Sequence, residues 1–180
     1  MKILALSGSL RAASSNTAAL RAAALLARPG VEIEVYDSLG ALPHFNPDLE
    51  DSEPAVVTDF RARVREADGL MISSPEYAHG VPGVMKNALD WLVGGSEFID
   101  MPVALINATP PAAYSQASIT ETLTVMSAHL VAAASIELPL RGRKLDAAGI
   151  AADPGMAEAL RAAIAAFVEA IPSIPRFRPG

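Results

Sequence analysis

The sequence predicts an α/β protein in which a five-stranded parallel sheet carries helices on both faces. Short apolar runs, typical of strands covered on both sides, alternate five times with longer segments of helical periodicity. No internal repeat or change of composition divides the 180 residues, a length that suits one domain around one core. We therefore expect a single domain over residues 1–180, with a loosely ordered tail over residues 172–180.

The five predicted strands differ in their expected exposure. Residues 3–6 are wholly apolar, as in a strand buried between two helical layers. Residues 31–36 alternate apolar with acidic side chains, which predicts a half-exposed strand at an edge of the sheet. The other strands are predicted at residues 69–73, 103–107 and 133–136.

Helices are expected after each strand, at residues 16–27, 54–67, 84–92, 116–129 and 154–170. The first ends before Pro29 and Gly30, a clear stop signal, and the second begins at Pro54, which suits a first helical turn. Trp91, the only tryptophan, is expected in the core or at a subunit contact. Residues 42–48 contain two prolines and are expected to form a connection.

A polar loop follows the first strand and precedes the first helix. Its donors are the side chains of Ser7, Ser9, Arg11, Ser14, Ser15, Asn16 and Thr17. Gly8 permits a tight turn and a close approach of the backbone. Together with the amino end of the helix, these groups suit a terminal phosphate monoester. The alternative is a solvated Ser/Asn helix cap.

Two common phosphate loops do not fit this segment. The sequence contains no Gly-Lys pair, which the ATP-type loop requires. The dinucleotide fingerprint needs three glycines, and Gly8 stands alone. Asp37 ends the second predicted strand as a ribose-binding acid would, but without those glycines a mononucleotide is the better match.

A second informative loop, residues 74–83, leaves the third strand. Its prolines and glycines fix a specific path, and Tyr77 and His79 bring flat side chains to the carboxyl end of a strand. Ligands of open parallel sheets bind at that end. A third loop, residues 108–115, follows the fourth strand.

Composition excludes several classes of function. The net charge of −6 and the absence of a basic cluster argue against nucleic-acid binding. Without cysteine there is no thiolate chemistry and no cysteine-ligated metal, and we predict no metal site, so redox chemistry would need a bound cofactor. No apolar run suits a signal peptide or a membrane span, so we expect a cytoplasmic protein without a membrane partner.

Two stretches of the chain resemble the NADPH-dependent FMN reductase family. They are residues 8–17 and residues 74–92, the latter containing SPEY and the uninterrupted run VPGVMKNALDWL. The resemblance implies the flavodoxin-like fold, a three-layer sandwich with strand order 2-1-3-4-5. That family includes flavin, quinone, azo-dye and chromate reductases.

The resemblance also implies the residues of a flavin site. By it, the FMN phosphate is held by Ser9, Arg11, Ser14, Ser15, Asn16 and Thr17. The isoalloxazine is lined by Pro75, Glu76, Tyr77, Ala78, His79 and Gly80, with the backbone amides of residues 77–80 reaching its polar edge. We expect no catalytic side chain, because hydride transfer to a flavin depends on stacking and orientation.

The chain departs from the common pattern of that family in two places. Ala78 stands where many members have Asn, so His79 either replaces that contact or shapes the loop. Pro110, Pro111 and Ala112 replace the glycines often seen in the third loop.

We therefore expect an FMN-dependent oxidoreductase that passes hydride from NADPH or NADH to a small acceptor such as a quinone, free flavin, azo compound or chromate. One alternative is a flavodoxin-like electron carrier for protein partners, although such carriers are usually more acidic around the flavin. The other is a regulatory relative that has lost the cofactor. A homodimer or homotetramer is implied by the resemblance.

Overall fold

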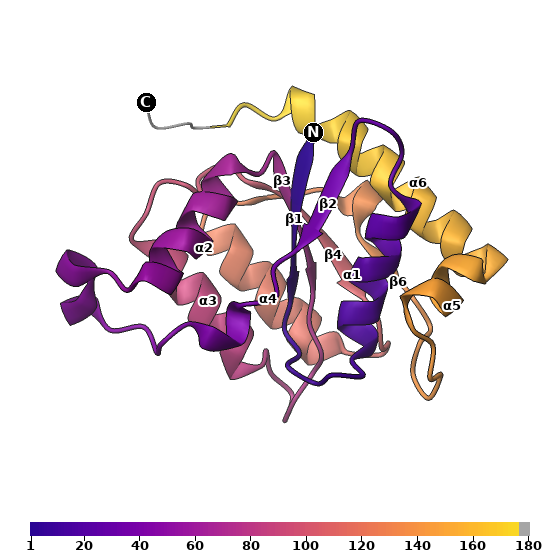
Figure 1. Cartoon of the computed structure of the whole chain (residues 1–180), viewed down its shortest axis with the longest axis horizontal. Helices are drawn as coiled ribbons and strands as arrows, with labels where there is room; N and C mark the ends of the chain where they lie inside the picture. The colour runs from indigo at the N-terminus through magenta and orange to yellow at the C-terminus, as the bar shows by residue number, and fades with distance from the viewer. Residues whose placement is uncertain (177–180) are drawn as a thin grey trace.

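The computed structural model describes residues 1–176, and Figure 1 shows a twisted sheet enclosed by two layers of helices. Its strands are β1 (Lys2–Ser7), β2 (Glu32–Val35), β3 (Gly69–Ser73), β4 (Pro102–Asn107), β5 (His129–Leu130) and β6 (Ile136–Glu137). The strand order is β2-β1-β3-β4-β5, β6 pairs with β4, and these pairings are parallel. The predicted order and the edge position of the second strand are confirmed.

The helices lie on both faces of the sheet, as predicted. They are α1 (Ser15–Leu26), α2 (Ala55–Glu66), α3 (Gly83–Val93), α4 (Ala113–Val125), α5 (Ala147–Ala152) and α6 (Pro154–Ala170). In Figure 1, α1, α5 and α6 cover one face and α2, α3 and α4 cover the other. The three-layer architecture is therefore confirmed.

The two faces of β1 show why this strand is apolar at successive positions. Leu4 and Leu6 pack into the core beneath α2 and α3, whereas Ile3 and Ala5 pack into the core beneath α1 and α6. A central parallel strand has no solvent face, so alternation of apolar and polar residues is not expected there. The strand is therefore covered by helices on both faces.

The prediction of a single fifth strand at residues 133–136 is wrong. The edge beside β4 is divided between β5 and β6, with a 3₁₀ turn at Ala132–Ala134 between them. Ser135 explains the interruption, because its hydroxyl accepts from the amide of Leu105 at 3.1 Å and donates to the carbonyl of Val131 at 3.1 Å. A side chain thus takes the place of a strand partner.

Two helices, α4 and α5, differ from the sequence-based expectation. Helix α4 begins three residues before the predicted start and ends at Val125, shortly before Ser127 adopts a left-handed φ of 63°. Helix α5 was not predicted; Asp146 caps it by accepting from the amide of Gly149 at 2.8 Å. Of the predicted tail, residues 177–180 lie outside the described part of the chain.

Trp91 belongs to the core, which decides between its two predicted positions. Its side chain is buried, and the indole donates to the carbonyl of Pro43 at 2.8 Å. The ring also meets Phe45 edge-on, with 5.1 Å between centroids. These contacts fix the connection after β2 against α3.

Candidate functional site

The loops that follow β1 and β3 meet at the carboxyl edge of the sheet. The amide of Gly8 donates to the carbonyl of Ser73 at 2.9 Å. A Cβ added at Gly8 would lie 2.3 Å from the hydroxyl oxygen of Ser74 and 2.9 Å from its Cβ. The glycine is therefore required by this close approach, as the sequence suggested.

The polar side chains at the start of α1 bond either to the backbone of the helix or to side chains of the neighbouring strands. Ser14 caps the helix, accepting from the amide of Thr17 at 3.3 Å, so the predicted helix cap is present at this position. The side-chain oxygen of Asn16 accepts from the hydroxyl of Ser73 at 2.9 Å, and Thr17 shares a 2.7 Å hydrogen bond with Ser7. Ser14 and Asn16 are buried, and their side chains thus hold the loop in place.

Donors nevertheless remain for an anion. Within residues 1–176, the amides of Ser15 and Asn16 donate to no protein acceptor. Free amides at the start of a helix, next to hydroxyls and a cation, form an anion site. The donor set therefore fits a phosphate monoester such as that of FMN.

A cavity of about 340 Å³ opens beside this loop. Its lining includes Ser7, Ser9, Arg11 and Thr17 from the loop and helix, together with Tyr36 and Asp37 from the end of β2. Asp37 is bound by Arg21 at 3.0 Å, so its carboxylate is already paired. Of the six predicted phosphate ligands, Ser9, Arg11 and Thr17 thus border this cavity, whereas Ser14, Ser15 and Asn16 do not.

Tyr36 lines that cavity with an uncharged side chain. Its hydroxyl donates to the carboxylate of Asp59 at 3.3 Å and lies 3.5 Å from the backbone carbonyl oxygen of Val56. Burial raises the pKa of Tyr36 to about 12, and the nearby charge of Asp59 acts in the same direction. The phenol therefore stays protonated and uncharged at neutral pH.

The loop after β3 folds into a tight turn at Tyr77–Gly80. The amide of Tyr77 donates to the carbonyl of Gly80 at 3.1 Å, and the reverse bond measures 3.0 Å. Ala78 and His79, between them, have left-handed φ values of 49° and 58°. Their amides donate to no protein acceptor in the described chain, so two of the four amides expected to reach the flavin are free.

Helix α4 is joined to this loop by side chains. The carboxylate of Glu76 accepts from the amide of Ser115 at 2.9 Å, and the Ser115 hydroxyl donates to the carbonyl of Pro75 at 3.2 Å. Tyr114 stacks on His79 with 4.2 Å between ring centroids and 18° between planes. Sequence analysis missed Tyr114 and Ser115; their position just after the fourth strand was the available signal.

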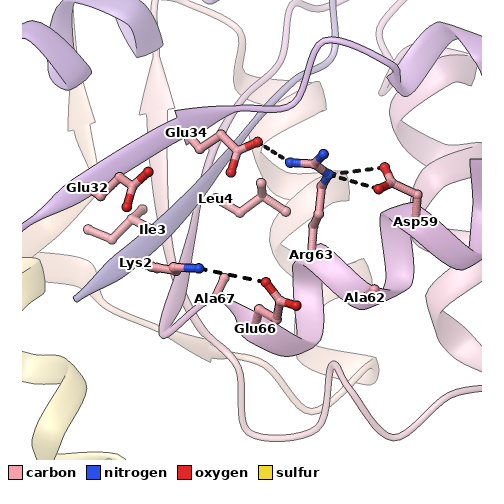
Figure 2. A pocket seen from close by; sticks show the side chains of 10 residues that line it. All are labelled: Lys2, Ile3, Leu4, Glu32, Glu34, Asp59, Ala62, Arg63, Glu66 and Ala67. Atoms are coloured by element: carbon pink, nitrogen blue, oxygen red, sulfur yellow. Dashed lines mark hydrogen bonds and ion pairs between the residues drawn. The ribbon is translucent and has the colours of Figure 1, made fainter.

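A second hollow, of about 290 Å³, lies between α2 and the amino ends of β1 and β2 (Figure 2). Its two cations are paired, since Arg63 binds both Glu34 and Asp59, and Lys2 lies 3.8 Å from Glu66. None of the predicted site residues lines it. The candidate site is therefore the carboxyl edge of the sheet.

The sequence profile of the NADPH-dependent FMN reductase family matches residues 1–142. The chain belongs to this family. Membership confirms the expected class, an oxidoreductase that uses FMN and NAD(P)H. Within residues 1–176, no helix of this family member is long and apolar enough to cross a membrane.

Individual relatives agree with the family. The chain is 35% identical over 159 residues to the NAD(P)H-dependent FMN reductase PA1204 of Pseudomonas aeruginosa, covering 81% of this chain and 85% of that protein. It is 36% identical over 106 residues to the quinone reductase of Escherichia coli K12, covering 58% of this chain and 55% of that protein. The shared region thus spans little more than half of the latter.

A solved structure agrees over a longer span. The flavoenzyme FerB of Paracoccus denitrificans, an NAD(P)H:(acceptor) oxidoreductase, is 28% identical to this chain with a TM-score of 0.79. The alignment covers 96% of this chain and 98% of that one. The flavodoxin-like fold expected from the sequence is therefore confirmed.

Proposed function

We propose that this family member passes hydride from NAD(P)H, through FMN bound at the carboxyl edge of its sheet, to a quinone or flavin acceptor. The observation that supports this proposal is the meeting of two loops at Gly8, because the free amides of both loops then belong to one edge of the sheet. Azo compounds and chromate are further acceptor classes. Bound FMN would supply the redox centre for both half-reactions.

The protein's own contribution is binding and orientation. Arg11, Ser9 and the free amides of Ser15 and Asn16 would hold the phosphate. The free amides of Ala78 and His79 would donate to the polar edge of the isoalloxazine, where negative charge gathers on reduction. Pro75, Glu76, Tyr77 and Gly80 complete that side of the site, and Glu76 acts there through its bond to Ser115.

Relatives support the acceptor class, since E. coli and a Burkholderia species have proteins named quinone reductase and 2-hydroxy-1,4-benzoquinone reductase. A cytoplasmic location and a homodimer or homotetramer are part of the proposal.

A visible spectrum tests the function directly. The purified protein, loaded with FMN and desalted, is expected to keep a flavin absorbance that bleaches when NADPH or NADH is added without oxygen. Adding a quinone should restore the colour. Retained flavin that neither nucleotide bleaches would favour the electron carrier, and a protein that takes up no FMN would favour the cofactor-free relative.

Replacing Arg11 should weaken FMN binding. A charge-assisted phosphate contact contributes about 1.5–3 kcal/mol, so Arg11→Ala should raise the FMN dissociation constant by about 10- to 150-fold. Quenching of FMN fluorescence on titration measures it. Arg28→Ala is the matched control, because it removes the same charge from an exposed position beyond the far end of α1. Equal affinities in the two variants would place the phosphate elsewhere.

A further inference from the structure

The turn at residues 78–79 adopts an unfavourable conformation. Turns with two consecutive left-handed residues are usually built from Asn-Gly or Asp-Gly, because a Cβ is disfavoured there. Here the positions are held by Ala78 and His79, with φ values of 49° and 58°. The alanine has no polar side chain to bond its own backbone, so the conformation depends on the two hydrogen bonds between Tyr77 and Gly80 and on contacts from outside the turn.

One such contact comes from α4. The His79 ring lies nearly parallel to that of Tyr114, 4.2 Å away between centroids. Tyr114 is 59% exposed, so its ring contributes little to the core. The neighbouring Ser115 is bonded to Glu76 and Pro75, at 2.9 and 3.2 Å, which fixes the start of α4 against the same loop. The stacked pair therefore connects the turn to a rigid support.

We infer that Tyr114 is a positioning residue which, by stacking on His79, holds the free amides of Ala78 and His79 in a donating orientation. This inference rests on the proposed function, in which those amides face the anionic edge of the reduced flavin. Preorganised donors stabilise developing charge more than donors that must reorient. Tyr114 should therefore favour the reduced cofactor over the oxidised one.

The test compares Tyr114→Ala with Tyr114→Phe, which keeps a ring, and with Val125→Ala, which shortens an exposed apolar side chain near the other end of α4. In Tyr114→Ala, the affinity for reduced FMN relative to oxidised FMN should fall about tenfold. For a two-electron couple this lowers the midpoint potential by about 30 mV. The other two variants should keep the wild-type potential. A wild-type potential in Tyr114→Ala would overturn the inference.

A second variant tests the route through His79. His79→Ala keeps a Cβ in the same backbone conformation but removes the stacked ring, so it should lower the potential to a similar extent. The potential of the double variant Tyr114→Ala/His79→Ala should then be no lower than that of either single variant. Additive shifts of the potential would show that Tyr114 does not act through His79. Loss of the upfield ring-current shift of the His79 protons in apo Tyr114→Ala checks the stack without any cofactor.

The failure of this inference can be distinguished from that of the proposed function. A wild-type protein that takes up no FMN would overturn both. A wild-type protein that binds FMN and is reduced by NAD(P)H, with no response of the potential to Tyr114→Ala, would overturn the inference alone.

Discussion

Gly8→Ala is expected to reduce FMN affinity by about 100-fold and to destabilise the fold by about 1–3 kcal/mol, the range for overpacked sites. The new methyl group would lie 2.3 Å from the Ser74 hydroxyl oxygen and 3.2 Å from the Ser74 Cα. Because the backbone of Ser74 is part of the obstruction, a change of rotamer cannot relieve it. The loops must separate, and with them the predicted phosphate and isoalloxazine sites.

Gly83→Ala is the matched control for Gly8→Ala. Gly83 begins α3, and a Cβ added there would meet no heavy atom within 4 Å. Gly83→Ala should therefore keep FMN affinity and, since alanine is the better helix former, lose no stability. FMN titration and urea unfolding measure both quantities. If Gly8→Ala binds FMN as tightly as Gly83→Ala does, the junction does not form the site.

The architecture could be predicted because burial on two faces leaves a simple pattern. The apolar runs at β1, β3 and β4 required covering on both sides, and the acidic alternation of β2 placed that strand at an edge. The fifth strand could not be located, since its interruption depends on the Ser135 hydroxyl meeting Leu105, 30 residues earlier. Periodicity carries no information about such a contact.

The same limit applies to the site. Residue types identified the two loops, but the partners of Asn16 and Glu76 lie 57 and 39 residues away, at Ser73 and Ser115. Both residues were expected to line the cofactor, and both are bonded within the protein. Whether a polar side chain faces a ligand or a neighbouring loop is decided by tertiary packing, which a local pattern does not contain.

Arg61→Met should be the most destabilising of the charge changes on α2, by about 3–5 kcal/mol. The side chain of Glu97 is only 2% exposed, and its carboxylate accepts from Nε of Arg61 at 2.5 Å. The hydrogen bond to Glu97 raises the pKa of Arg61 further above its usual range, so the guanidinium keeps its charge. Removing the guanidinium would leave a buried carboxylate without its cation.

Two comparisons separate this cause from general disruption of α2. Arg65→Met removes a charge from an exposed position on the same helix and should change the urea midpoint little. Arg61 also binds Glu53 at 2.6 Å, and the side chain of Glu53 is 20% exposed. The double variant Arg61→Met/Glu97→Met replaces the guanidinium and its most buried partner with apolar groups. It should recover part of the loss, because the carboxylate that remains unpaired, Glu53, is in contact with solvent. If the double variant is as unstable as Arg61→Met, the loss comes from the missing Arg61 side chain itself and not from the unpaired charge of Glu97.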